Sequence, residues 1–596
     1  MNPHPARLAA LRAAMKTAQL DAWIVPTADP HLSEYLPEHW QNRVWLSGFT
    51  GSAGTLVLTA DAAALWVDSR YFVQAAHQLE GSGIEMGKLG NGETHTDWLL
   101  AQLPEGSRVG AAADMLSLAA QKQWQQALSA KNITLEACAD LVGQIRTDRP
   151  ALPQEPIYAH HADFVVEGCA DKLARVRAFM AEKGADYHLI SGLDDIAWLT
   201  NLRGSDVAYN PVFLAHMLIG RNDAVLFADT RKLRPSENTA LQAAGIQTAP
   251  YEDTAAALAE ISGSLLVDPA KTAASTVAQL PPSVHLVEHL NPTALFKAIK
   301  TPQEAAHIRT AMREDGIALC GFFAEFERKL AAGDRLTELD IADMLIAHRS
   351  QRPHYVSPSF GTIAGFNANG ALPHYSATPE AHSEISGNGL LLIDSGAQYH
   401  SGTTDITRVV PVGTPSAAQC RDYTLVLKAH IALAEAVFPE NTPAPMLDMI
   451  ARQPMWQAQC DYGHGTGHGV GFFMNVHEGP QVLAYRAPLT PHNLMREGMF
   501  TSNEPGLYRE GQWGIRIENL ILAVPVENPQ ETGFGRFLRF DTLTLCPIDT
   551  RLIDTAMLTE AERAWLNRYH TEVRQTLAPH LEGEALAWLS LRTEAL

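Results

Sequence analysis

A chain of 596 residues is too long for one hydrophobic core, so its length predicts three or four domains. Hydrophobic residues make up 46% of the chain and charged residues 19%, which is the balance of an ordinary globular protein. The formal net charge of -21 argues against nucleic acid or an anionic membrane as a main partner, because both repel an acidic surface.

The first expected element is an amphipathic helix, because arginines interrupt the apolar residues of MNPHPARLAALRAAMKTAQLDAW. This pattern fits a transit peptide less well, and it lacks the long apolar region of a signal peptide. No run of about 18 apolar residues follows, so no membrane-spanning helix is expected. Six cysteines are scattered without CxxC spacing, which indicates a reducing compartment and predicts a cytoplasmic protein.

The first 300 residues contain an internal repeat. RVWLSGFTGSAGTLVLT and ALWVDSRYF come first, and IAWLTNLRGSDVAYNPVFLAHMLI and AVLFADTRKL follow about one domain length later. Each copy contains a Trp-Leu segment, a Gly-Ser turn, an apolar strand and a strand that ends in Asp-x-Arg. The matching order predicts two related α/β domains.

Two segments are the expected domain boundaries. Three prolines in RTDRPALPQEP, residues 146–156, disfavour regular structure. Near residue 300, Thr301, Pro302 and Glu304 form the capping signature of a new helix. The predicted domains are therefore 1–155, 156–299 and 300–596, and the last includes a C-terminal helical extension. In that extension Thr559 and Glu562 predict a helix whose apolar face contacts either its own domain or a second subunit.

Two aspartates frame a predicted hairpin in GLLLIDSGAQYHSGTTDITRVVPV. Residues 391–393 form a buried strand that carries Asp394 at its end, and Asp405 opens or lies within the returning strand, 406–412. Two antiparallel strands can bring the two carboxylates face to face, where they repel each other unless a cation lies between them. Two solvated turn aspartates remain the alternative.

Two glutamates come from the later segments FTSNEPGLY and WGIRIENLILAVPV. Glu504 precedes a Pro-Gly turn that ends its strand. Ile515 and Ile517 alternate with Arg516 and Glu518, which predicts one strand that carries the last two side chains on the same face.

Between these carboxylates lies GHGTGHGVGFFMNVHEGP, residues 463–480, with three histidines. Four carboxylates carry a charge of -4 that two divalent cations would balance, whereas without metal the carboxylates would raise one another's pKa. This oxygen-rich set suits manganese, cobalt or iron better than structural zinc, and two such ions favour metal-assisted hydrolysis. A nucleophilic Ser or Cys site and a phosphate-binding loop have no matching motif.

The order IDSGAQYxxGTTDITR, GHGTGHGVG, NVHEGP, NEPGLY and GIRIEN resembles the pita-bread metallopeptidases, and within them the long three-domain cytosolic form of aminopeptidase P. WVDSRYF and WLxNLRGSDVxxNPVF also match that form. The resemblance implies two creatinase-like α/β domains followed by a pita-bread catalytic domain, a combination of α/β and α+β classes. It also implies hydrolysis of the bond between an N-terminal residue and a following proline, through two metal ions and a bridging hydroxide.

The resemblance assigns a role to each site residue. Asp394 would hold the first metal ion, Asp405 and Glu518 would bridge both, and His468 with Glu504 would hold the second. The expected catalytic residues are Glu504, His464, His374 and His477. The expected substrate-binding residues are His374, His477, Arg70 and Arg516, although Arg70 could equally form a structural ion pair. Manganese is the expected metal, peptides with proline in the second position are the expected substrates, and a homodimer is the expected assembly.

Several alternatives share the fold. A prolidase would cleave Xaa-Pro dipeptides only, and the two N-terminal domains favour the aminopeptidase over it. A methionine aminopeptidase would not need 300 residues before its catalytic domain. A non-catalytic peptide-binding module or a creatinase-like hydrolase would lack metal ligands, whereas all five positions carry ligand residues here.

Overall fold

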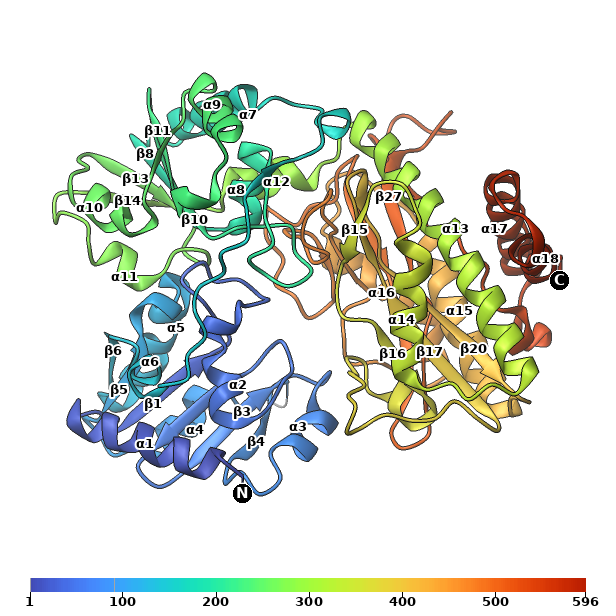
Figure 1. The fold of residues 1–596 in the computed structure, drawn as a ribbon, viewed down its shortest axis with the longest axis horizontal. Helices are drawn as coiled ribbons and strands as arrows, with labels where there is room; N and C mark the ends of the chain where they lie inside the picture. Colours follow the sequence, from blue (N-terminus) through green and yellow to red (C-terminus); the bar gives the residue numbers. More distant parts are fainter. Residues whose placement is uncertain (1, 91) are drawn as a thin grey trace. The chain divides into compact units, whose positions relative to one another are not determined.

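Two six-stranded mixed sheets form the first of the two units into which the chain divides, Met1–Ala294 and Leu295–Leu596. The computed structural model describes residues 2–90 and 92–596 (Figure 1). The strand order is β4-β3-β2-β1-β5-β6 in the first sheet and β12-β11-β10-β8-β13-β14 in the second. In both sheets the first three strands along the chain pair antiparallel, and the outer strands add in parallel.

The strands of the first sheet are β1 Ala22–Pro26, β2 Thr55–Thr59, β3 Ala63–Val67, β4 Glu85–Lys88, β5 Arg108–Ala112 and β6 Thr134–Cys138. The strands of the second are β8 Tyr187–Ile190, β10 Ala215–Gly220, β11 Ala224–Ala228, β12 Gln247–Ala249, β13 Ser264–Val267 and β14 His285–Glu288, and a short pair is formed by β7 Tyr158–Ala159 and β9 Leu202–Arg203. The helices that accompany these strands are α1 His4–Thr17, α2 Asn42–Ser47, α3 Phe72–Gln78, α4 His95–Gln102, α5 Leu118–Leu128, α6 Leu141–Ile145, α7 Cys169–Glu182, α8 Leu193–Thr200, α9 Pro235–Ala243, α10 Thr254–Ala259, α11 Ala274–Val277 and α12 Pro292–Ala298.

The shared topology confirms the two related α/β domains that the internal repeat predicts. The Asp-x-Arg ends of the repeat also adopt the same local structure. Asp68 forms an ion pair with Arg70 at 2.8 Å just after β3, and Asp229 forms one with Arg231 at 2.7 Å just after β11. Arg70 therefore does form the local ion pair that the sequence left open as an alternative.

A buried polar cluster joins the two sheet domains within the first unit. His31 of the first domain lies 3.0 Å from the Ser191 carbonyl oxygen through Nδ1 and 2.9 Å from the Tyr251 hydroxyl through Nε2. Its ring stacks on that of His216, with centroids 4.6 Å apart. Burial lowers the pKa of His31 to about 4, so the ring is neutral at physiological pH.

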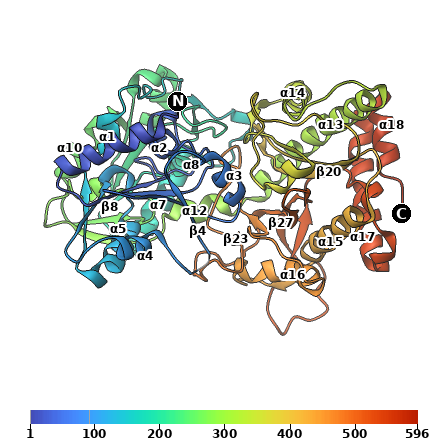
Figure 2. The same cartoon turned by 90° about the horizontal axis from the view of Figure 1, so that it is seen from below.

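The second unit places small sheets between two pairs of helices. Figures 1 and 2 both show α13 and α14 on one side of the strands and α15 and α16 on the other. Its helices are α13 Pro302–Ala332, α14 Glu338–Arg349, α15 Ala417–Ala434, α16 Ala444–Gln457, α17 Glu560–Leu577 and α18 Gly583–Arg592. Its strands are β15 Tyr355–Pro358, β16 Ile363–Phe366, β17 Gly389–Ser395, β18 Ala397–Tyr399, β19 Gly402–Thr403, β20 Ile406–Val412, β21 Val437–Pro439, β22 Gly467–His468, β23 Val482–Leu483, β24 Phe500–Asn503, β25 Gly506–Arg509, β26 Trp513–Arg516, β27 Asn519–Pro525 and β28 Phe537–Thr542.

The capping signatures mark helix starts as expected. Thr301 and Thr559 each accept a hydrogen bond from the backbone three residues later, in complete capping boxes at the starts of α13 and α17. The apolar face of α17 is buried in the core of its own unit, which is the first of the two contacts that the sequence left open. Among the helices that the structure describes, none has the length and apolar character needed to cross a membrane.

Candidate metal centre

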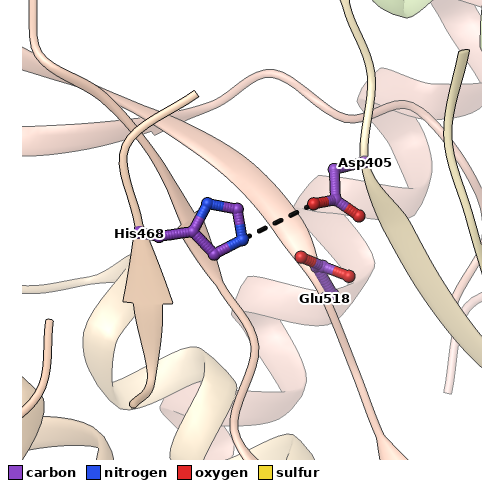
Figure 3. Close-up of side chains that lie close together, drawn as sticks. All are labelled: Asp405, His468 and Glu518. Carbon is purple, nitrogen blue, oxygen red and sulfur yellow. Dashed lines mark ion pairs between the residues drawn. The ribbon is translucent and has the colours of Figure 1, made fainter. Parts of the chain in front are cut away.

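The predicted metal ligands all belong to the second unit, on different segments that the sheets bring together. Asp394 lies on β17, Asp405 precedes β20, His468 ends β22, Glu504 follows β24, and Glu518 lies between β26 and β27. Ligand atoms of Asp405, His468 and Glu518 all lie within 4.8 Å of one another, and Figure 3 shows these side chains pointing to a common centre.

The sheet register corrects one prediction. In the antiparallel pair β17 and β20, the residue opposite Asp394 is Thr407, so the two aspartates are not directly face to face. Asp405 lies two residues before Thr407, just before the strand begins. Strand pairing therefore brings the two aspartates near each other along a diagonal, an offset that the hairpin sequence did not specify.

A second prediction is wrong in its details. Residues 513–525 form two strands, β26 and β27, with Ile517 and Glu518 between them, because β26 pairs with β25 whereas β27 pairs with β24. Arg516 and Glu518 nevertheless meet at one point. Thr407 Oγ1 accepts a hydrogen bond from Arg516 Nε at 3.1 Å and donates one to Glu518 Oε2 at 2.7 Å.

The geometry of His468 fits a metal ligand. Its Nδ1 lies 2.9 Å from the Gly469 carbonyl oxygen, which can only accept, so Nδ1 carries the proton. Nε2 then presents a lone pair toward Asp405 Oδ2 at 3.6 Å and Glu504 Oε1 at 3.5 Å. A lone pair that faces two carboxylate oxygens is a suitable environment for a cation.

The electrostatics of the carboxylates also favour a bound cation. Burial, followed by the neighbouring carboxylates, raises the pKa of Asp405 and of Glu518, and burial raises the pKa of Glu504 to about 7. Oδ1 of Asp394 is buried and has no hydrogen-bond partner among the described residues. An open carboxylate oxygen in a crowded group of acids can be satisfied by a metal ion, so these residues fit divalent metal binding.

The surrounding hydrogen bonds orient the ligands. Arg516 Nη2 donates to Asp394 Oδ2 at 2.7 Å, and the guanidinium is almost fully buried. Ser502 Oγ accepts from the His468 backbone N–H at 3.0 Å and donates to Glu504 Oε1 at 3.3 Å. Partners of this kind hold metal ligands in position.

The histidines proposed for catalysis lie around this centre. The ring of His477 packs edge-on against His468, with centroids 4.3 Å apart. His464 places Nδ1 2.7 Å from the Gly465 carbonyl oxygen and Nε2 2.8 Å from the Tyr508 hydroxyl. Burial raises the pKa of Tyr508 to about 12, so its phenol is protonated and donates to His464.

Comparison with known proteins places this geometry in a family. Residues 306–525 match the profile described as metallopeptidase family M24, residues 7–147 and 148–304 match two profiles of the creatinase/prolidase N-terminal domain, and residues 536–596 match the C-terminal region of peptidase M24. Aminopeptidase P2 of Arabidopsis thaliana is 38% identical over 97% of this chain and 86% of its own length. Xaa-Pro aminopeptidase 1 of Dictyostelium discoideum is 36% identical over 98% of this chain and 96% of its own. The chain belongs to the Xaa-Pro aminopeptidases of metallopeptidase family M24.

A solved structure of the same family supports the fold as a whole. The X-prolyl aminopeptidase of Caenorhabditis elegans, described as a cytosolic enzyme with a dinuclear active site, covers 99% of both chains with a TM-score of 0.94 and 31% identity. The two creatinase-like domains and the pita-bread domain that the sequence predicts are thereby confirmed.

Three predicted substrate residues lie in different surroundings. Arg516 contacts Asp394, so the structure places it beside a predicted ligand. His374 lies on the loop between β16 and β17, next to Pro373, whose carbonyl oxygen is 3.4 Å from Arg516 Nη2. Arg70 belongs to the other unit, Met1–Ala294, where it pairs with Asp68.

Sequence reasoning missed three residues of the centre: Thr407, Ser502 and Tyr508. Tyr508 stands in the segment NEPGLY, four residues after Glu504, and its position on β25 opposite Gly514 puts it next to the strand that carries Arg516. The only available signal was the proximity of each residue to a ligand in the sequence.

Proposed function

We propose that the protein removes the first residue from peptides whose second residue is proline. The main support is the convergence of Asp405, His468 and Glu518, whose ligand atoms lie within 4.8 Å of one another in a chain of the Xaa-Pro aminopeptidase family. The relatives carry this specificity in their names, and the long N-terminal part that they share with this chain favours the aminopeptidase over a prolidase.

The residues that would hold two divalent cations, of which manganese is the proposed identity, are Asp394, Asp405, His468, Glu504 and Glu518. Hard carboxylate oxygens outnumber nitrogen in this set, which suits manganese. When bound, two such ions would supply Lewis-acid chemistry: they would polarise a scissile carbonyl and make a water nucleophilic near neutral pH.

The protein side chains supply proton transfer and orientation. The nitrogen that leaves is a tertiary amide without its own hydrogen, so it must take up a proton as the C–N bond breaks. Glu504 is the proposed carrier of that proton, because its Oε1 lies among the proposed ligand atoms, 3.5 Å from His468 Nε2. His464 holds a hydrogen bond to Tyr508 through Nε2, which makes it a proton-relay candidate.

Substrate contacts are assigned to the remaining residues. His477 lies against His468 and would donate to the carbonyl oxygen as negative charge develops there. His374 would contact the substrate from the β16–β17 loop, and Arg516 would act through Asp394 and that same loop. Arg70 is proposed as a substrate contact of the first domain.

The compartment, the assembly and the domain boundaries are also proposed. All six cysteines are free, which agrees with a reducing cytoplasm, and the C. elegans relative is described as cytosolic. A homodimer and domains 1–155, 156–299 and 300–596 are the proposed organisation.

Cleavage of Arg-Pro-Pro and of a plain Xaa-Pro dipeptide by purified, metal-stripped protein tests the proposal, first alone and then with manganese restored. Release of the first residue from the tripeptide only after metal addition is the expected result. Cleavage confined to the dipeptide would make the protein a prolidase. Cleavage of neither substrate with manganese, cobalt, iron or zinc would refute the proposal in favour of a peptide-binding role.

A further inference from the structure

The loop that carries His374 is organised around one buried acid, Glu338. This residue is the first of α14, directly after the N-cap residue Thr337, and it is 1% exposed. Neither the ligand set nor the proposed mechanism uses it. A fully buried carboxylate is costly unless hydrogen bonds satisfy it, so its partners indicate what it does.

Among the described residues, every hydrogen-bond partner of the carboxylate belongs to the segment that runs from Phe366, the last residue of β16, to the start of β17. Oε1 accepts from the Phe366 backbone N–H at 2.6 Å and from Asn369 Nδ2 at 3.0 Å. Oε2 accepts from the Tyr375 hydroxyl at 2.8 Å and from the Ser383 backbone N–H at 2.7 Å. These donors are neutral, and together they span 18 residues of chain, 366–383, around a single charge.

Tyr375 links this centre to His374. Burial, and then the hydrogen bond to Glu338, raise the pKa of Tyr375, so the phenol keeps its proton and donates a hydrogen bond to the carboxylate. Asn369 Nδ2 also contacts the Tyr375 hydroxyl at 3.0 Å, which fixes the ring from a second side. The backbone N–H of Tyr375 donates to the Leu372 carbonyl at 3.0 Å and closes a tight turn around His374.

The other side of His374 is held from the metal centre. Pro373 accepts a hydrogen bond from Arg516 Nη2 at 3.4 Å, and the same nitrogen donates to Asp394 at 2.7 Å. The start of the loop also packs closely against β26, because a Cβ at Gly514 would overlap the carbonyl oxygen of Gly370. His374 therefore stands between a residue tied to the metal centre and a residue tied to Glu338.

We infer that Glu338 is a positioning residue for the reaction: it acts through Tyr375 to hold His374 toward the substrate. This inference rests on the proposed role of His374. A charge is needed because four donors converge on two oxygens, and hydrogen bonds to an ionised acceptor are about twice as strong as neutral ones. Glutamine keeps the shape of the side chain, but its N–H₂ group faces donors and cannot accept from them. The hydrogen bonds that one of the two carboxylate oxygens makes to the loop must therefore break.

The test combines activity, metal content and hydrogen exchange in the full-length metal-loaded protein. Glu338→Gln should lower kcat for Arg-Pro-Pro by about 10- to 100-fold, the loss that follows a small misplacement of a catalytic group. Bound metal should not change, and amide exchange should accelerate in residues 367–383. Tyr375→Phe removes one hydroxyl and should give the same pattern with a smaller loss.

Glu384→Gln is the matched control. It makes the same chemical change beside the end of the loop, in an exposed ion pair with Arg335, and should leave kcat and exchange unchanged. A double-mutant cycle supplies the decisive comparison: in a His374→Ala background, Glu338→Gln should cost less than about threefold in kcat, because its effect passes through the missing ring.

Two results would overturn the inference. One is a kinetic result that excludes His374 as the route of the effect: either the loss of kcat is equal with and without His374, or the His374→Ala variant is as active as the wild type. The other is unchanged exchange of residues 367–383 in both Glu338→Gln and Tyr375→Phe. If the wild-type protein cleaves no Xaa-Pro substrate, the proposed function fails, whereas the exchange measurement still decides whether Glu338 holds the loop.

Discussion

Replacement of Asp405 by asparagine should have opposite effects on the metal-free and the metal-loaded protein. Asp405 and Glu518 place ligand atoms within 4.8 Å of each other. At an effective dielectric constant of about 20, two unit charges at that separation repel each other by about 3 kcal/mol. Removing one charge should therefore stabilise the metal-free fold, although asparagine takes away a ligand that the metal-loaded centre needs.

The size of this gain depends on pH. Burial and the neighbouring carboxylates raise the pKa of Asp405 above its value in the unfolded chain. The wild-type fold therefore loses stability as pH rises from about 4 through that raised pKa, since the unfolded chain releases the proton first. The variant lacks this loss, so its advantage should grow with pH and reach about 1–3 kcal/mol at pH 8.

Urea unfolding of the full-length protein measures both effects. The relevant unfolding transition is the one whose urea midpoint moves when metal is added to the wild-type protein. With a chelator at pH 8, the midpoint of this transition should be higher in Asp405→Asn than in the wild type. With excess manganese the wild type should have the higher midpoint, because metal binding stabilises only a fold with an intact site. Turnover by Asp405→Asn should be abolished. Asp334→Asn, in the exposed segment just after α13, is the control and should change neither midpoint.

Either of two results would refute the reasoning. A lower midpoint in the presence of chelator would mean that Asp405 supports the fold as an ordinary hydrogen-bonded group. Near-normal turnover would mean that the carboxylate does not hold metal.

Other perturbations separate the roles of neighbouring groups. His464→Gln should lower turnover by about 10²-fold or more and leave metal content intact; loss of metal on elemental analysis would identify His464 as a ligand. Glu504→Gln should remove both activity and part of the metal, and a variant that keeps full turnover would exclude the proposed proton transfer. His31→Gln should flatten the fall in stability between pH 7 and pH 5, measured by urea unfolding. Burial holds the pKa of His31 at about 4, whereas an unfolded histidine titrates near 6.5, so the unfolded chain gains the proton first and the wild-type fold loses about 2 kcal/mol by pH 5. An unchanged pH dependence in the variant would contradict the buried, neutral state of this ring.

Features encoded within a few residues were predictable from the sequence. The capping boxes at Thr301 and Thr559 depend on contacts over three residues, and both helices begin where those residues predict. The repeated Asp-x-Arg segments likewise predict two related domains, because the same local hydrogen bonds form at the same point of each sheet. The ordered motifs predicted five ligand positions through resemblance to a family, and the ligand atoms of three of them, Asp405, His468 and Glu518, lie close together.

The tertiary structure alone decided how those positions meet. The placement of Thr407 between Arg516 and Glu518 depends on contacts between segments more than 100 residues apart (516 − 407 and 518 − 407). The change of strand partner at Ile517 and Glu518 depends on which strand each side of this break pairs with, β25 for β26 and β24 for β27. Glu338 shows no sign of its role in the sequence, since it reads as an ordinary first-turn acid of a helix. Local spacing determines which elements form and which side chains are available. The mutual geometry of buried charges is decided only when distant strands pair and exclude water, because the cost of an unsatisfied carboxylate arises at burial.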